Sequence, residues 1–317
     1  MKPDLPPRAK SAAPQPPRAS DDLSAPFLDS LHANGRLRVW SIVMTIFGDM
    51  VHPRSSPQQP ARLALSDLSR LTEGLGIAAG ALRTAMSRLT KEGWLERHKE
   101  GRSAWYQLSF SGAANAEAAS RRIYAPCIRP AVEVWRLEMS KPHTGPEPGF
   151  APPHDVARYG LSDTLFLTPL PATSDALTDR ARPYSGSPEA DSLIIEGRLN
   201  SIPAWLLDSL IPISVTQDYA ELAGLLQALS SKLDQLRALS PQDAIVLRCL
   251  LLHFWRRLIL KHRPLPLNLL PQDWPGLDCS RLLPPLYDAL WPASEAWLHD
   301  AGLPSRRDGA PLWGAPV

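Results

Sequence analysis

The sequence predicts an α+β protein of 317 residues. Three observations predict this class: apolar residues at helical spacing followed by a basic hairpin, three short β-prone segments, and long apolar stripes in the final third. We expect four parts along the chain: a disordered tail over 1–30, a winged helix-turn-helix domain over 31–124, an α+β domain over 125–215 and a helical domain over 216–317.

The first 30 residues are rich in proline, serine and alanine, a composition that buries too little apolar surface to fold. Residues 1–35 hold four basic and four acidic side chains, so their charges cancel and attract DNA phosphate only weakly. From 37 to 47 the chain is almost continuously apolar, which predicts a helix. The segment HPRSSPQQPAR follows with three prolines and predicts a loop.

The segment LALSDLSRLTEG (63–74) predicts the next helix, because apolar positions in it and just after it recur every three or four residues. These positions are Leu65, Leu68, Leu71 and Leu75. Ser66 and Asp67 are candidate N-caps, since a short side-chain oxygen accepts a hydrogen bond from a free amide of the first turn. Gly74 and Gly76 are expected to end the helix, because glycine adopts positive φ at little cost.

A second helix is predicted over 78–93, directly after the glycine turn. One arc of this helix is apolar or small: Leu82, Ala85, Met86, Leu89 and Gly93. The opposite arc is cationic and hydrogen-bonding: Arg83, Thr84, Ser87, Arg88 and Lys91. Two short helices joined by a glycine turn, the second cationic outward, are typical of a helix-turn-helix whose second helix enters the DNA major groove.

The segments WLERH and SAWYQL alternate apolar and polar residues around KEGR, which predicts a two-stranded wing with Gly101 in its turn. Arg97, Lys99 and Arg102 on this wing are candidate contacts to phosphate or to the minor groove. Residues 36–124 contain 13 basic and 7 acidic side chains, a net charge of +6, whereas everything after 124 has a net charge of −4. This asymmetry favours a polyanionic partner over the alternative that both charged faces are only solvated.

After the wing, an alanine-rich segment up to residue 124 predicts a connecting helix. The segments 131–139, 164–169 and 192–199 are short and β-prone, and they predict a small α+β domain. In the final third, one apolar stripe predicts a long helix: Tyr219, Leu222, Leu225, Leu226, Leu229, Leu233 and Leu236. Another helix is expected to begin at Ser240 and Pro241, with serine as N-cap and proline in the first turn.

Composition and motifs disfavour several classes of protein. The three cysteines lie far apart without CxxC spacing, so neither a disulfide framework nor a zinc site is expected. The sequence shows no apolar signal segment and no apolar run long enough to span a bilayer, which favours a cytoplasmic protein without membrane contact. It also lacks GxSxG, HExxH and a phosphate-binding glycine loop, so we expect no catalytic residues, metal or cofactor.

Several runs resemble, in order and spacing, the PaaX family of phenylacetate-degradation repressors. In the N-terminal half they are SIVMTIFGDMVHPRSS (41–56), LRTAMSRLTKEGWL (82–95), EGRSAWYQLS (100–109) and RRIY (121–124). In the C-terminal third they are HFWRR (253–257), LPLNLLPQDWPG (265–276) and LYDALWPASEAWL (286–298). The sequence departs from the family pattern at 141–155 and at His262 with Arg263.

The resemblance implies a dimeric, ligand-responsive repressor of transcription that binds a double-stranded DNA operator. It also implies a ferredoxin-like, Cas2-like fold for the middle domain, although the departure at 141–155 falls where that fold has its first helix. The implied effector is an aryl-coenzyme A thioester of the phenylacetyl-coenzyme A type. The implied target is a catabolic pathway for an aromatic acid such as phenylacetate.

Three residues of the C-terminal domain, His253, Arg256 and Arg257, lie at i, i+3 and i+4 and therefore share one face of the predicted helix. They are candidate contacts to the phosphates of an acyl-coenzyme A, because guanidinium binds phosphate bidentately. The favoured alternative is a structural ion-pair cluster with acidic residues of the same domain: Asp273, Asp278 or Glu295.

A second hypothesis is a metal-dependent nuclease that uses the Cas2-like middle domain. Such an enzyme needs carboxylates placed to hold a divalent metal. Glu133 and Glu138 lie on the first predicted strand of the middle domain, but no further carboxylate of the sequence converges on them. We therefore favour the transcriptional regulator over the enzyme.

Overall fold

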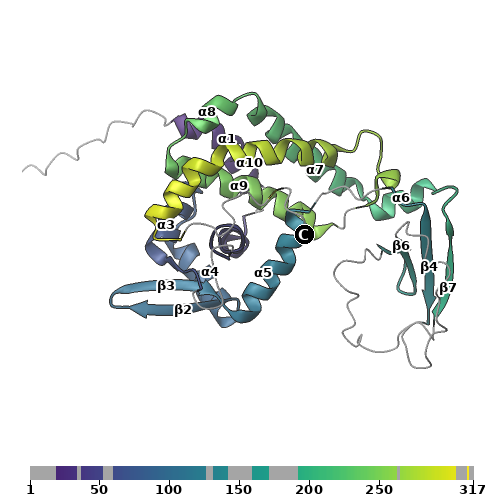
Figure 1. Cartoon of the computed structure of the whole chain (residues 1–317), viewed down its shortest axis with the longest axis horizontal. Coiled ribbons are helices and arrows are strands. Elements are labelled where there is room, and N and C mark those ends of the chain that lie inside the picture. Colours follow the sequence, from purple (N-terminus) through teal and green to yellow (C-terminus); the bar gives the residue numbers. More distant parts are fainter. Residues whose placement is uncertain are drawn as a thin grey trace, which may run out of the picture.

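The computed structural model describes residues 19–33, 37–52, 60–125, 131–141, 159–170, 192–262, 265–304 and 313. The chain belongs to the α+β class, as predicted. A helical body carries a small three-stranded sheet, and a separate four-stranded sheet lies beside this body, connected to it through helix α6 (Figure 1). Within the described ranges no helix has the length and apolarity needed to cross a membrane.

The first described element is helix α1, Ala19–His32, which lies partly where the sequence predicted a disordered tail. Leu23, Phe27 and Leu31 are buried at four-residue spacing, and the Phe27 ring packs edge-on against Phe254 at 5.7 Å. The prediction of a tail reaching residue 30 is therefore corrected, because these three side chains bury enough apolar surface to order a helix. The part of the tail over 1–18 lies outside the described residues.

The predicted helix at 37–47 is confirmed. It comprises α2, Val39–Thr45, which continues directly into a π-helical turn, η2, Ile46–Val51. Five of the six residues in this turn are buried, and one of them is Asp49. Most of the predicted proline loop lies outside the described residues. A π-helical turn widens the helix locally and often marks a functional position.

The two helices of the predicted helix-turn-helix are confirmed as α3, Leu65–Gly74, and α4, Ala79–Lys91. Gly76 in the intervening turn has a φ of 69°, as expected for a glycine turn. The N-cap prediction is wrong: Ala64 occupies the N-cap position of α3 without a side-chain hydrogen bond, and the strand residues before it set where the helix begins.

The predicted hairpin is confirmed as β2, Leu95–Glu100, and β3, Ser103–Leu108, with Gly101 in the turn at a φ of 59°. Strand β1, Leu63–Ala64, pairs with the other side of β3, so the antiparallel sheet has the order β1-β3-β2. In Figure 1 the hairpin projects from the edge of the helical body.

Helix α5, Phe110–Ile123, follows the hairpin at the position predicted for a connecting helix. Ser109 is its N-cap and accepts a hydrogen bond from the Gly112 amide at 3.0 Å. Gly112 passes so close to the segment after α4 that an added Cβ would lie 2.2 Å from the Trp94 carbonyl oxygen. The start of α5 is thereby held against the end of α4.

The three predicted strands of the middle domain are confirmed as β4, Val134–Ser140, β6, Leu165–Pro169, and β7, Ser192–Arg198. With β5, Tyr159–Gly160, they form an antiparallel sheet of order β5-β6-β4-β7. The chain between β4 and β5, which includes most of the 141–155 departure, and the chain between β6 and β7 lie outside the described residues. The ferredoxin-like fold, which requires helices there, stays a prediction.

The C-terminal part is helical, as predicted, but the apolar stripe expected to form one long helix is interrupted by a turn at Ser231 and Lys232. Its elements are α6, Ala204–Leu210, α7, Ile213–Ser230, α8, Leu233–Arg237, α9, Pro241–Lys261, the 3-10 turn η6, Leu267–Leu269, and α10, Pro275–Asp300. The predicted start of α9 is confirmed, because Ser240 Oγ accepts a hydrogen bond from the Asp243 amide at 3.2 Å.

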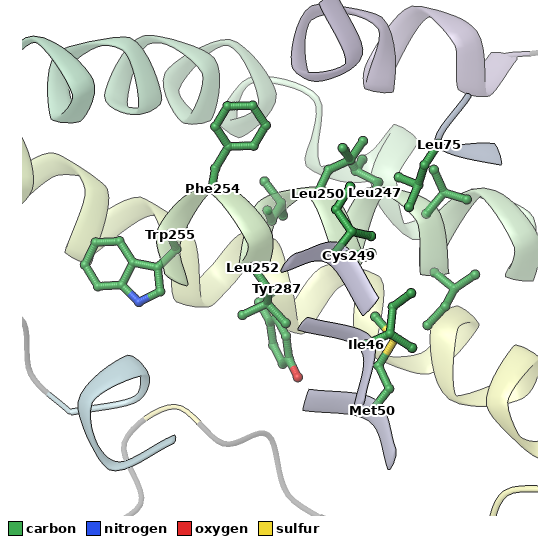
Figure 2. Packing of buried hydrophobic residues seen from close by; sticks show 14 of the residues in the cluster. Ile46, Met50, Leu75, Leu247, Cys249, Leu250, Leu252, Phe254, Trp255 and Tyr287 are labelled. Atoms are coloured by element: carbon green, nitrogen blue, oxygen red, sulfur yellow. The ribbon is translucent and has the colours of Figure 1, made fainter. Parts of the chain in front are cut away.

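Helix α9 is the central element of the helical body. Side chains from Ala244 to Trp255 are all buried, so this helix is covered on every side rather than on one face. Figure 2 shows Leu247, Leu250 and Leu252 of α9 in one cluster with Ile46 and Met50 of η2, Leu75 and Tyr287. The N-terminal elements and the C-terminal helices therefore share a single hydrophobic core.

Gly112→Ala should destabilise the protein, because the new methyl group meets the backbone carbonyl of Trp94, which cannot rotate away. Forced overpacking of this kind costs about 1–3 kcal/mol, which outweighs the gain of up to about 1 kcal/mol in helix propensity. Urea unfolding monitored by circular dichroism measures the difference. Gly80→Ala on α4 is the matched control, since its added Cβ meets nothing within 4 Å and should leave stability equal or slightly raised.

Candidate nucleic-acid interface and its buried support

The outward face of α4 carries the side chains that the sequence assigned to DNA recognition. Arg83, Thr84, Ser87, Arg88 and Lys91 are all exposed, and with Glu92 they line one open hollow on the surface. The opposite face is buried: Leu82, Met86 and Leu89 lie inside the shared core, and Ala85 is buried beside them. The predicted division of α4 into two faces is confirmed; contact of the outer face with DNA stays a prediction.

The cations of this face differ in how far they are already engaged. Arg88 Nε donates a hydrogen bond to Glu92 Oε1 at 2.6 Å, one turn further along the helix. Arg83 and Lys91 have no ion-pair partner among the residues that the structure describes. Because an exposed i,i+4 pair is worth only about 0.3–0.5 kcal/mol, Arg88 can exchange Glu92 for an external anion at little cost.

The wing separates its charges by face. Arg97 and Lys99 are two residues apart on β2 and therefore project from the same side of the strand, whereas Glu96 and Glu100 project from the other side. Both glutamates are engaged within the sheet, Glu96 with Gln107 at 2.9 Å and Glu100 with Arg62 at 2.8 Å. Arg97, Lys99 and Arg102 in the turn are exposed, so one face of the wing is cationic.

A buried ion pair that sequence analysis missed lies behind this surface. Arg248 of α9 is completely buried and donates to Asp49 Oδ2 from Nε at 3.1 Å and from Nη2 at 2.9 Å. The other carboxylate oxygen of Asp49 accepts hydrogen bonds from the hydroxyls of Tyr124 and Tyr287. Asp49 thus receives donors from α9, α10 and the end of α5 at once.

The rest of the Arg248 guanidinium is equally well engaged. Its Nη1 donates to Ser294 Oγ at 3.0 Å and to Glu295 Oε1 at 2.9 Å, and its plane lies 4.5 Å from the Trp291 ring centroid. Burial alone would lower the pKa of Arg248, but Asp49, Tyr287 and Glu295 outweigh burial and raise it. Burial and the neighbouring Asp49 raise the pKa of Tyr124, which keeps its hydroxyl a donor.

The end of α5 is fixed to α9 by two further hydrogen bonds. Trp255 Nε1 donates to the Ile123 carbonyl at 2.8 Å. Arg122 Nη2 donates to the Ile259 carbonyl at 2.7 Å, which provides a cation and a donor for the free carbonyls at the C-terminal end of α9. The helix that follows the wing is therefore anchored to the centre of the C-terminal helices.

Two contacts likewise fix α3, the helix that precedes α4, to the C-terminal helices. The Arg70 guanidinium lies 4.8 Å from the Trp297 ring centroid, at a distance typical of a cation–π contact. Gln242 Nε2 donates to the Arg70 carbonyl at 3.2 Å and its Oε1 accepts from Trp297 Nε1 at 2.7 Å. The surface that presents α4 is thus supported from α9 and α10.

The expected cationic patch of His253, Arg256 and Arg257 does not exist as a unit. His253 is buried, its Nδ1 lies 3.2 Å from Thr45 Oγ1, and burial followed by the charges of Arg257 and Arg256 lowers its pKa to about 3. The imidazole is therefore neutral at neutral pH. The i, i+3, i+4 spacing failed as a surface criterion because α9 is covered on nearly all sides.

The two arginines of this set face different environments. Arg256 is partly buried and lines a pocket beside η2 and α5, whereas Arg257 is exposed in a shallow hollow with Asp218, Glu221 and Lys261. Among the residues that the structure describes, the alternative of an ion-pair cluster is not found either. Of the acidic residues it named, Glu295 pairs with Arg248 and Asp278 pairs with Arg281.

The described residues give no support to the nuclease hypothesis. Glu133 pairs with Arg198 at 3.0 Å on the surface, and Glu138 accepts a hydrogen bond from Ser192 at 3.3 Å. Across the described ranges no group of three histidine, cysteine or acidic side chains is placed to hold a metal ion. The residues proposed as metal ligands are instead engaged with neighbours on the sheet.

Asp49→Asn should destabilise the protein strongly, because it leaves the Arg248 guanidinium buried without its principal counter-charge. Removal of one partner of a buried pair costs about 3–5 kcal/mol. Glu100→Gln, which breaks the exposed pair with Arg62, is the control and should cost no more than about 1 kcal/mol. Thermal and urea unfolding of both variants measure the difference; equal losses would show that the buried pair contributes no more than a surface pair.

Comparisons with known proteins agree with the positions of the resembling runs. The model of a PaaX-like protein matches residues 38–112, and the model of the PaaX-like protein C-terminal domain matches 213–300. The transcriptional repressor PaaX of Escherichia coli (strain K12) is 28% identical over 281 residues, 83% of each chain. The structure of the uncharacterized protein Rv0674 from Mycobacterium tuberculosis aligns with 79% of this chain and 96% of its own, at 20% identity and a TM-score of 0.42, too low to establish a shared fold. The two family matches together span about half of the chain, on both sides of the middle sheet, and the chain belongs to the PaaX-like family.

Proposed function

We propose that this protein is a DNA-binding transcriptional regulator that acts as a repressor. The observation that carries the proposal is the exposed cationic and hydrogen-bonding face of α4 next to the cationic face of the wing. The relative from Escherichia coli is a transcriptional repressor, which supports the same role here. No observation favours the nuclease.

In the proposed complex, α3 and α4 act as a helix-turn-helix with α4 in the major groove and the β2–β3 hairpin as its wing. Arg83 and Arg88 have the side chains that most often contact guanine, through bidentate hydrogen bonds to O6 and N7. Thr84, Ser87 and Lys91 supply further hydrogen bonds to bases or phosphates. Arg97, Lys99 and Arg102 on the wing set affinity and register through phosphate contacts.

We further propose that the protein is a homodimer on a double-stranded operator, with two α4 helices in major grooves about one helical turn apart. Occupancy of a promoter then blocks transcription of a pathway for an aromatic acid such as phenylacetate. An aryl-coenzyme A thioester releases the DNA only if it binds the DNA-incompetent conformation better than the competent one. The sequence assigned three residues to the phosphates of this effector. Of these three, Arg257 is exposed and can contact the phosphates without a change in the fold.

Arg83→Ala and Arg88→Ala should each lower the preference for operator over random DNA. Loss of one bidentate contact to guanine costs about 1–3 kcal/mol and relaxes specificity at that base pair. Fluorescence anisotropy with operator and random duplexes measures both affinities. Arg237→Ala on α8, which Figure 1 shows on the side of the body away from the hairpin, is the control and should leave the ratio unchanged. An unchanged ratio in both α4 variants would exclude this helix as the source of specificity.

The double variant Lys99→Ala with Arg102→Ala should weaken operator and random DNA alike. Each lost phosphate contact lowers the slope of log K against log salt by about 0.9, so the double variant should lose about twice that. Titrations from low to moderate salt measure the slope. Arg237→Ala with Arg281→Ala removes the same charge from helices α8 and α10 and serves as control. A wing that does not touch DNA would give the wild-type slope in both double variants.

A further inference from the structure

A pocket of about 250 Å³ lies between η2, α5 and α9. Its wall is mainly apolar, with Met44, Trp94, Ala119, Ile123, Leu252 and Leu260 among the lining residues. The volume is just below the range of roughly 300–1,000 Å³ that is typical of pockets for drug-sized ligands. A ligand enclosed here must therefore be small, and a whole coenzyme A thioester does not fit.

Two charged side chains, Asp49 and Arg256, line this mainly apolar pocket. Arg256 is partly buried, and within the described part of the chain it makes only long hydrogen bonds, from Nη1 to the Ser41 carbonyl at 3.4 Å and to Ser41 Oγ at 3.5 Å. No carboxylate of the described residues lies within ion-pair distance of it. Burial lowers the pKa of Arg256. A desolvated guanidinium with free donors is unfavourable alone and becomes favourable when an anion supplies the missing acceptors.

The carboxylate of Asp49 does not act as the counter-ion of Arg256. Asp49 also lines the pocket, but its two oxygens accept from Arg248, Tyr124 and Tyr287, as described above. Its charge is compensated by Arg248 rather than by Arg256. The pocket thus contrasts with the Asp49–Arg248 site: there the cation has its anion in the protein, and at Arg256 the anion has to come from elsewhere.

We propose that this pocket binds a small organic acid, with the carboxylate on Arg256 and an aryl or short alkyl body against the apolar wall. The geometry also connects the ligand to the DNA-binding elements. Trp94 contributes to the wall and lies between the end of α4 and the start of β2, and its amide donates to the Leu89 carbonyl at 2.9 Å. An occupant therefore contacts the residue that joins α4 to the wing. The coupling between ligand binding and DNA binding rests on the proposed function, whereas the binding site itself does not.

The test is calorimetric titration of the full-length protein, without DNA, with benzoate, 3-phenylpropanoate and hexanoate, and with benzamide as the uncharged match of benzoate. We expect at least one carboxylate to bind and the amide to bind at least tenfold more weakly. Arg256→Gln, which removes the charge but keeps a donor for Ser41, should weaken carboxylate binding at least tenfold. Arg121→Gln, at an exposed position of α5 that does not line the pocket, is the matched control and should stay within twofold of wild type.

A second variant tests the pocket without changing Arg256, so its result does not depend on how Arg256→Gln affects the local fold. Ala119→Phe retains the guanidinium and fills the pocket, so it should also abolish carboxylate binding. The proposal is overturned if none of the three carboxylates binds the wild type at millimolar concentration, or if Arg256→Gln binds them as well as Arg121→Gln does. It is equally overturned if only an aryl-coenzyme A thioester binds and Ala119→Phe does not affect that binding.

Coupling to DNA has its own readout. Operator affinity of the wild type should change at least threefold when the bound carboxylate is saturating, and the affinity of Arg256→Gln should not respond. Binding of the carboxylate with no change in operator affinity would overturn the coupling between the pocket and the DNA-binding elements. If neither the wild type nor any variant binds DNA, the proposed function is overturned, but the calorimetric result for the pocket remains valid.

Discussion

The ion pair between Asp49 and Arg248 is the interaction on which the rest of the structure depends. A buried charge is costly unless a partner and a full set of hydrogen bonds accompany it. Asp49 meets this condition only when η2, α9, α10 and the residue after α5 come together around one carboxylate. The pair therefore specifies how the N-terminal helices sit on the C-terminal ones, a task that apolar contacts alone would define less sharply.

This arrangement makes the proposed DNA-binding surface a property of the whole helical body. Helix α3 rests on α9 and α10 through Arg70, α4 contributes its apolar face to the same core, and α5 is held by Trp255 and Arg122. The C-terminal helices do more than follow a separate DNA-binding module. They fix the position from which α4 and the wing are presented, so a small shift at their contact changes the presented surface.

Sequence analysis succeeded where the signal is local. The two faces of α4 and the hairpin around Gly101 follow from periodicity and turn chemistry within a few residues. It failed where the outcome depends on distant partners. Asp49 and Arg248 are 199 positions apart, so nothing local identifies them as a pair, although a lone arginine in the apolar run of α9 requires some buried partner. Helix α1 was missed because its three anchoring side chains lie in a proline- and serine-rich context.

The separate core of the middle sheet has a consequence for how the protein unfolds. Trp135, Tyr159 and Leu167 of the sheet pack with Leu265 and Leu269 in a small cluster of their own, apart from the large cluster of the helical body. Cooperative units of a protein follow such boundaries, and a unit with few buried contacts opens at a lower free energy. We therefore expect denaturation in two steps, with the sheet lost first. Only the later step reports on the body that carries α4, so a single melting temperature would average two distinct events.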